Sequence, residues 1–216
     1  MSAMKLHNYF RSSASWRVRI ALALKGLDYD YAAIHLGRNE QFEQPFAGQQ
    51  ASHLVPALEL DDGRWLGQSM AIIEYLDETH PEPPLLPREA LDRAYVRALS
   101  QDIACEIHPL NNLRVLRYLT QELGVSEENK DRWYRHWVET GLEVVERRLV
   151  GEGRAGAFCF GDTPGMADCL LVPQVFNAQR FKARLDHVPT VMRIHEACMK
   201  RDAFAKTQPS ACPDAE

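Results

Sequence analysis

The 216-residue sequence has no uninterrupted apolar run near the roughly 18 residues that a membrane-spanning helix needs. It has no basic excess either, because 25 Lys and Arg against 30 Asp and Glu give a formal net charge of −5. Proteins that bind nucleic acid or anionic membranes need a basic surface, so the sequence argues against both classes. The first residues, MSAMKLHNYF, also lack the apolar core of a secretory signal.

Cysteine is scarce and scattered. The five cysteines are an odd number and form no C-x-x-C pair. This pattern indicates neither a disulfide scaffold nor a zinc site, so no metal is expected. The expected compartment is the cytoplasm, where free thiols persist.

The N-terminal part of the sequence mixes strand-like and helix-like patterns. Residues 5–10 and 29–36 predict strands, and 55–67 predicts a hairpin because the turn DDG separates two apolar runs. Residues 15–26 and 68–81 predict helices, the first from its Ala, Leu and Arg content and the second from its amphipathic spacing. A short helix or loop is expected between the second strand and the hairpin.

A proline-rich segment, PEPPLLPR at 81–88, holds four of the twelve prolines. Such a segment continues neither a helix nor a strand, so a domain boundary is expected there. After it the patterns are helical, and the last residues, 207–216, read as a loosely ordered tail. The helical stretches are 91–124, which Pro109 should kink or split at His108, then 128–151, 165–181 and 188–204. The expected domains are 1–82, a linker over 83–88, and an all-helical domain over 89–216.

Two serines precede the first predicted helix. Ser12 and Ser13 offer hydroxyls beside backbone N–H groups and the positive end of a helix dipole, a combination that favours an anion. A thiol with a pKa of about 8.5 needs about 1.4 kcal/mol of preference for the thiolate per unit of lowering, which one or two charge-assisted hydrogen bonds supply. On the local sequence alone, simple helix capping is the favoured interpretation of the same serines.

Several motifs in order resemble the zeta class of the cytosolic glutathione transferases, and together they cover nearly the whole chain. They are SSASWRVRIALALKG (12–26), VPALEL (55–60), GQSMAIIEYLDETHP (67–81), EIHPLNNLRVL (106–116), GDTPGMADCLLVPQV (161–175) and NAQRF (177–181). The resemblance implies the glutathione transferase fold. That fold has an α/β thioredoxin-like N-terminal domain with a mixed four-stranded sheet, followed by an all-α helical bundle.

The resemblance implies that glutathione is the cofactor. Ser12 would hold its sulfur with Ser13 beside it, and a cis Val55–Pro56 peptide would present its backbone to the extended tripeptide. The remaining implied glutathione contacts are Gln41, Gln68 and Ser69 in the first domain and His108, Asn112 and Arg114 in the second. For Gln68 and Ser69 the alternative is an N-cap, and for His108 it is the cap of a kinked helix.

The second substrate would be a small anionic keto acid. Its carboxylates call for arginine, whose planar fork matches a carboxylate. Arg11, Arg114 and Arg180 are the candidates, and Arg11 joins Ser12 and Ser13 as a candidate catalytic residue. Taken singly, each arginine is also compatible with an ordinary solvated surface position.

The sequence departs from the family pattern at two places. Ala14 stands where many zeta-class proteins have cysteine, so the nucleophilic sulfur must come from glutathione. The box before the helix at 165–181 begins with Gly165 rather than threonine, and Asp168 should still bond back to the turn as a structural cap.

The activity that the resemblance implies is cis-trans isomerisation of maleylacetoacetate to fumarylacetoacetate by thiolate addition, bond rotation and elimination. One alternative is the shorter keto acid maleylpyruvate, by the same mechanism. Others are a general glutathione transferase with an open apolar second site and a noncatalytic binding protein that kept the fold. The resemblance also implies a homodimer.

Overall fold

The computed structural model describes residues 4–216 and divides into two compact units. The first unit holds the described residues up to Leu85 together with Lys200–Glu216, and the second unit is Leu86–Met199. The end of the chain thus differs from the expected division, which assigns all of 89–216 to the helical domain. The hydrogen bonds of the last ten residues, described below, account for this difference.

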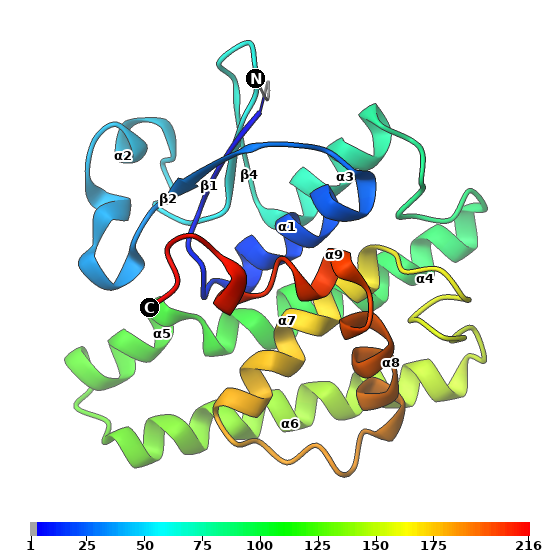
Figure 1. Ribbon diagram of the computed structural model, residues 1–216. Helices are drawn as coiled ribbons and strands as arrows, with labels where there is room; N and C mark the ends of the chain where they lie inside the picture. Colours follow the sequence, from blue (N-terminus) through cyan, green and yellow to red (C-terminus); the bar gives the residue numbers. More distant parts are fainter. Residues whose placement is uncertain (1–3) are drawn as a thin grey trace. The chain divides into compact units, whose positions relative to one another are not determined.

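The first unit is built on a mixed four-stranded sheet with the strand order β2-β1-β3-β4 (Figure 1). β1 (Lys5–Asn8) runs parallel to β2 (Asp30–Ala33) and antiparallel to β3 (Ala57–Glu59), which is antiparallel to β4 (Trp65–Gly67). The expected thioredoxin-like sheet is confirmed. Its register places the end of β1, the end of β2, the start of β3 and the end of β4 at the same edge.

Two helices of the first unit pack against each other, α1 (Ser13–Lys25) and α3 (Ser69–Thr79). α1 ends at Gly26, whose left-handed φ of 64° suits glycine and lets its N–H bond to the last turn. Between β2 and β3 the chain forms only short helical turns. These are η1 (Leu36–Arg38), η2 (Glu40–Phe42) and α2 (Phe46–Gln49).

The second unit is built of helices, as expected. They are α4 (Ala90–Gln101), η3 (Asp102–Ile107), η4 (His108–Asn111), α5 (Leu113–Arg117), η5 (Tyr118–Glu122), α6 (Glu127–Gly151), α7 (Met166–Arg180) and α8 (Pro189–Met199). The stretch 91–124 is split at His108, where the π-helical η3 gives way to the 3₁₀-helical η4. Pro109 causes the predicted break because it has no N–H to donate.

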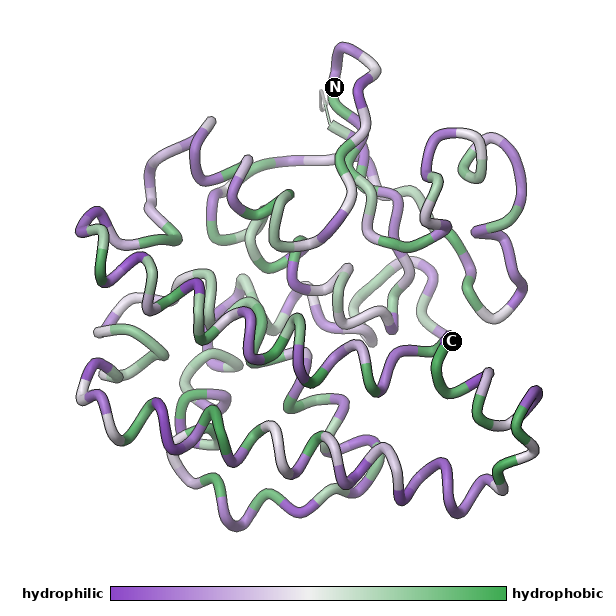
Figure 2. Tube along the Cα trace, turned by 180° about the vertical axis from the view of Figure 1, so that it is seen from behind, coloured by the Kyte–Doolittle hydropathy of each residue, from purple (hydrophilic) through white to green (hydrophobic). Residues whose placement is uncertain are grey.

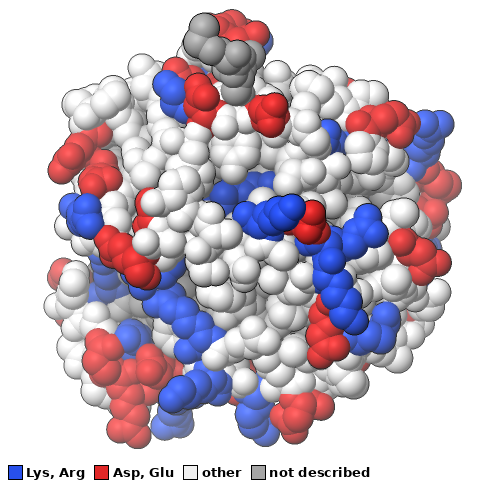
Figure 3. Space-filling view, viewed as in Figure 1, with Lys and Arg blue, Asp and Glu red and all other residues white. Residues whose placement is uncertain are grey.

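The two longest helices of the second unit differ in their surroundings. α7 is buried without a break from Met166 to Val175, which confirms the expectation of a central bundle helix. α6 alternates hydrophobic and hydrophilic residues along its length (Figure 2). Within residues 4–216, no helix has both the length and the apolar character of a membrane span. Basic and acidic side chains are interspersed on the face seen in Figure 3.

The C-terminal segment, Thr207–Glu216, follows α9 (Asp202–Ala205) and contains η6 (Pro209–Ala211). The expectation of a loosely ordered tail is wrong. The Oγ1 of Thr207 accepts a hydrogen bond from the Trp16 indole at 3.0 Å, and its carbonyl accepts one from the Arg19 Nε at 3.1 Å. Cys212 belongs to a core cluster with Tyr9, Phe10 and Val55. The sequence pattern missed these contacts because the segment is short, polar and rich in small residues.

Candidate functional site

Ser12 is the N-cap of α1 and lies directly after the connection from β1. Its Oγ accepts a hydrogen bond from the N–H of Ser15 at 3.2 Å, so the hydroxyl still has its own hydrogen to donate. Ser13 is buried at the first helical position. The N-terminal end of α1 carries a partial positive charge, so an anion held by the Ser12 hydroxyl also gains from the helix dipole. This arrangement can stabilise a bound thiolate.

Arg11 is exposed, and its guanidinium contacts the two preceding residues, Tyr9 and Phe10. Its Nη2 and Nε donate to the Tyr9 hydroxyl at 2.8 and 3.3 Å, and its guanidinium lies 5.1 Å from the centroid of the Phe10 ring. Tyr9 is only 5% exposed, so a buried phenol anchors an exposed cation. The guanidinium keeps further N–H groups available for a carboxylate.

Ser69 begins α3, and a buried arginine stands behind it. The Nη1 of Arg17 donates to the Ser69 Oγ at 3.3 Å, while Arg17 is 2% exposed and Ser69 6%. Because the Oγ accepts this bond, its hydrogen is directed to another acceptor. Gln68, the N-cap, has a φ of 66°, a conformation that costs a non-glycine residue about 1–3 kcal/mol and is typical of functional sites. This helix start can hold a carboxylate.

The other two predicted segments of the first unit also lie at this edge of the sheet or in the loop that leaves it. The Val55–Pro56 peptide bond is cis, as the resemblance implies, and directly precedes β3. Gln41 lies in η2, is 5% exposed, and its Oε1 has no hydrogen-bond partner within residues 4–216. The sheet register therefore gathers Ser12, Val55 and Ser69 at one edge. Ser12 can stabilise a thiolate, Ser69 can bind a carboxylate, and the Val55 backbone lies at the same edge. This combination fits a peptide such as glutathione.

The second unit carries a separate group of predicted residues around η4 and α5. Asn112 caps α5 through an Oδ1 that accepts from the Arg114 N–H at 3.1 Å. Its Nδ2 lies 3.5 Å from the Nε2 of His108, which begins η4. Arg114 is exposed at the start of α5. These contacts hold the Asn112 side chain between its two neighbours and leave the Arg114 side chain at the surface.

Arg180 ends α7 and is exposed. Its guanidinium lies 5.5 Å from the centroid of the Phe181 ring, which stacks on Tyr134 with centroids 3.6 Å apart. Burial raises the pKa of Tyr134, so this phenol stays neutral. The stacked rings give Arg180 an apolar base beneath its charge, which limits the conformations that it can adopt.

Three of the protein's own thiols, those of Cys159, Cys198 and Cys212, are poor nucleophiles because they are buried. All five cysteines are free, and burial raises the pKa of the Cys159, Cys198 and Cys212 thiols. Ala14 leaves no sulfur beside Ser12. No group of three or more His, Cys, Asp or Glu side chains within residues 4–216 is placed to hold a metal ion. Sulfur chemistry at Ser12 therefore needs a thiol that the ligand brings.

Asp168 forms the predicted cap of α7. Its Oδ2 accepts from the Gly165 N–H at 2.8 Å, and its Oδ1 accepts from the Cys159 N–H at 2.9 Å. The bond back to the turn is thus confirmed, and the contact with Cys159 is an additional one. Burial raises the pKa of this carboxyl, which is only 1% exposed. Its contacts are structural.

Three supporting residues were missed by sequence reasoning: Tyr9, Arg17 and Arg19. Arg19 is 1% exposed, and it donates to the Asn8 Oδ1 at 2.9 Å and to the Phe10 carbonyl at 2.9 Å. The sequence does contain a signal for Arg17 and Arg19. Both stand in an otherwise apolar helix pattern, and a buried charge requires partners. That signal does not say which partners they have.

Comparisons with known proteins place the chain among glutathione-using enzymes. Residues 11–79 match the family model "Glutathione S-transferase, N-terminal domain". A "Probable maleylacetoacetate isomerase" of Vibrio cholerae is 46% identical over 217 residues, covering 100% of both chains.

Two solved structures are also similar over nearly the whole chain. A holo structure of maleylpyruvate isomerase, described as a bacterial glutathione transferase of the zeta class, has a TM-score of 0.95 and 43% identity, covering 98% of this chain and 100% of its own. A maleylacetoacetate isomerase from Anaeromyxobacter dehalogenans 2CP-1, with glutathione bound in its active site, has a TM-score of 0.88 and 42% identity, covering 100% of both.

Proposed function

Because the chain belongs to the zeta-class glutathione transferase family that includes the maleylacetoacetate and maleylpyruvate isomerases, we propose that it is a glutathione-dependent cis-trans isomerase of maleylacetoacetate. The single observation that carries this proposal is Ser12 at the N-cap of α1, with a hydroxyl hydrogen available to a thiolate. Maleylpyruvate is the second candidate substrate, because a structurally similar relative bears that name and presents the same fold.

The residues of the first unit would bind glutathione. Ser12 donates its hydroxyl hydrogen to the sulfur and, with Ser13 and the α1 dipole, stabilises the thiolate. Ser69 donates to the γ-glutamyl carboxylate beside Gln68, and the Val55 backbone and Gln41 contact the rest of the tripeptide. When bound, glutathione supplies a thiol that adds to and leaves the double bond, so that the bond rotates in between.

The arginines would bind the anionic substrate. Arg11 is the most direct candidate, because Tyr9 fixes its guanidinium next to Ser12 while leaving N–H groups available. Arg114 and Arg180 are proposed for the remaining carboxylate and for the negative charge that develops on the carbonyl oxygen. His108 and Asn112, which lie close to Arg114 in the chain, are proposed as further glutathione contacts.

The proposal is tested by incubating the protein with maleylacetone and with maleylpyruvate, each with and without glutathione. Rapid appearance of the trans isomer is expected only with glutathione, because the protein has no thiol beside Ser12. The ratio of kcat/KM values for the two acids decides which is preferred. Conjugate accumulation without isomerisation would instead favour the general transferase, and no reaction with either acid would contradict an isomerase.

Arg17→Met is expected to weaken glutathione binding by about tenfold or more. The proposed hydrogen bond from the Ser69 hydroxyl to the ligand carboxylate, which Arg17 orients, contributes about 1.5–3 kcal/mol because it involves a charged group. Without the guanidinium, the Ser69 hydroxyl is free to turn away from the ligand carboxylate. Isothermal titration of glutathione measures the effect, and Arg17→Lys should recover part of it. Exposed Arg64, which pairs with Asp62 in the hairpin turn, provides the control as Arg64→Met. Equal affinities for all variants would contradict the role of Arg17.

We further propose that the chain acts as a homodimer in the cytoplasm. Family membership supports the dimer, and five free cysteines support a reducing compartment. Light scattering of the purified protein tests the dimer, because the expected mass is twice the 24.6 kDa of one chain.

A further inference from the structure

Asp214, near the end of the chain, accepts two hydrogen bonds from elements at the opposite end of the sequence. Its Oδ2 accepts from the Phe10 N–H at 3.2 Å, and its Oδ1 accepts from the Tyr31 hydroxyl of β2. Figure 1 shows this red segment beside the blue connection between β1 and α1. Burial raises the pKa of Tyr31, and the bond to Asp214 raises it further, so the phenol remains a donor. The side-chain carboxylate of Asp214 thus holds the backbone of Phe10, two residues before Ser12.

The same peptide backbone is held from its other side. The Phe10 carbonyl accepts from the Arg19 Nη2 at 2.9 Å, and the Nε of Arg19 donates to the carbonyl of Thr207 in the C-terminal segment. Both main-chain groups of Phe10 therefore end on charged side chains. Because hydrogen bonds to charged groups are stronger than those between neutral groups, the segment from Tyr9 to Ser12 is fixed by more than its own turn.

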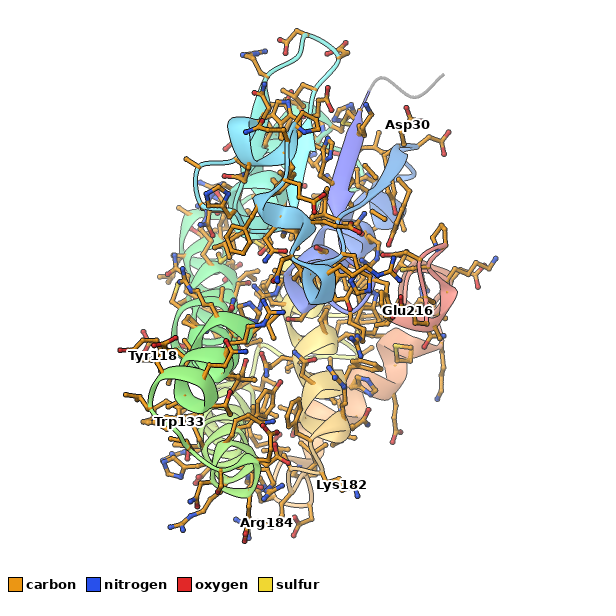
Figure 4. All side chains as sticks on the ribbon, turned by 90° about the vertical axis from the view of Figure 1, so that its left-hand side faces the viewer. Asp30, Tyr118, Trp133, Lys182, Arg184 and Glu216 are labelled. Carbon is orange, nitrogen blue, oxygen red and sulfur yellow. The ribbon has the colours of Figure 1, made fainter. Side chains whose placement is uncertain are left out.

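A second series of contacts connects Glu216, the last residue, to Arg11 through His35 and Tyr9. The Nδ1 of His35 accepts from the Arg38 N–H at 3.1 Å, and its Nε2 lies 3.2 Å from the Glu216 Oε1 without meeting hydrogen-bond geometry. The His35 ring packs edge-on against the Tyr9 ring, with the ring centroids 5.0 Å apart. The Tyr9 hydroxyl in turn accepts a hydrogen bond from the Arg11 guanidinium. Glu216, labelled in Figure 4, is half exposed, so this series of contacts is the weaker of the two.

We propose that the C-terminal segment is a positioning element of the glutathione site, with Asp214 as its principal positioning residue. Asp214 fixes the Phe10 peptide and, through it, the Ser12 hydroxyl and the Arg11 guanidinium. A displacement of about 1 Å at a reacting group costs about 100-fold in rate, so a tether two residues away has a large effect. This inference rests on the proposed function, since it concerns the residues that hold the glutathione sulfur.

Amide hydrogen exchange in the protein without glutathione tests the tether itself. Asp214→Ala is expected to speed exchange at the Phe10 N–H by about tenfold or more, since it removes a bond of about 1.5 kcal/mol or more. Asp214→Asn should restore slow exchange, because its amide oxygen can accept from Phe10 while its Nδ2 donates to the Tyr31 oxygen. Asp202→Ala, which removes an exposed carboxylate paired with Lys206 in the same part of the chain, should change nothing.

The ultraviolet absorbance of the thiolate, followed against pH with glutathione bound, tests the consequence at Ser12. In Asp214→Ala the pKa of the bound thiol should rise by about one unit, a tenfold loss of thiolate preference, with kcat falling in proportion and KM for glutathione changing little. Asp214→Asn should return both values to those of the wild type.

Each outcome decides a different claim. Unchanged Phe10 exchange and an unchanged thiol pKa in a folded Asp214→Ala variant overturn the inference and leave the isomerase proposal intact. A wild-type protein that neither binds glutathione nor isomerises overturns the proposed function instead. If Asp214→Ala does not fold, Tyr31→Phe decides, because it frees one side of the Asp214 carboxylate. About threefold faster Phe10 exchange then supports the inference, and an unchanged rate overturns it.

Discussion

Ser12→Ala is expected to lower kcat for glutathione-dependent isomerisation by roughly 10- to 150-fold, because a hydrogen bond to a charged group contributes about 1.5–3 kcal/mol. The Ser12 hydroxyl has a hydrogen to donate while its Oγ caps α1. Without it, the pKa of the bound glutathione thiol should rise by about one to two units toward its ordinary value of about 8.5. Glutathione affinity should fall less, because Ser69 and the Val55 backbone remain.

Steady-state kinetics and the absorbance titration of the bound thiolate measure this effect. Ser126→Ala is the matched control, because Ser126 caps α6 in the same way through the Asn129 N–H at 3.3 Å. Both variants should lose about 1 kcal/mol of stability from the missing cap, but only the Ser12 variant should lose turnover. Normal turnover in a folded Ser12→Ala variant would contradict the proposed role of Ser12 in holding the thiolate.

Asp168→Ala is expected to lower the free energy of unfolding by about 2–6 kcal/mol. The substitution leaves the buried N–H of Cys159 and the half-buried N–H of Gly165 without an acceptor, at up to about 1–3 kcal/mol each. For a chain of this length, the melting temperature should fall by roughly 2–4 °C per kcal/mol. At temperatures well below unfolding, the pKa of the bound glutathione thiol should stay unchanged, because the contacts of Asp168 are structural.

The Asp168 effect also has a definite pH dependence. Burial raises the pKa of this carboxyl in the folded state above its unfolded value. Its protonation therefore adds stability below the unfolded pKa of about 3.9, and this contribution is lost as the pH rises through the folded pKa. The stability gap between wild type and variant should widen as the pH falls, and a narrowing gap would contradict this sign.

Calorimetric melting of the two proteins between neutral and acid pH measures the Asp168 effect. Asp162→Ala is the matched control, since Asp162 accepts a single hydrogen bond from the Ala157 N–H at 2.9 Å in an exposed loop. It should lose about 1 kcal/mol or less, because water replaces an exposed partner.

Local patterns predicted most of the fold and part of the candidate site. Ser12 as an N-cap and Gly26 as a helix stop follow from the preferences of single residues, and the break at His108 follows from the missing N–H of Pro109. The resemblance added the cis peptide at Val55–Pro56. Each of these features depends on residues adjacent in the sequence, which is why it can be read there.

The rest depends on contacts between distant residues. Arg17 and Arg19 stand out in an apolar helix, but their partners Ser69 and Thr207 lie 52 and 188 residues away. Asp214 meets Phe10 across 204 residues, in a segment whose composition indicates disorder. Composition reports the average behaviour of a segment in water, whereas a core cysteine and a few charge-assisted bonds decide whether it is ordered.

The most direct test of glutathione-dependent isomerisation is a single reaction followed by proton NMR, with maleylacetone in excess over glutathione and the protein at catalytic concentration. The trans isomer should replace the cis isomer completely, and the glutathione resonances should return unchanged in amount after many turnovers. Conversion limited to one molecule per glutathione, with a stable thioether as product, would contradict isomerisation and identify a conjugating transferase.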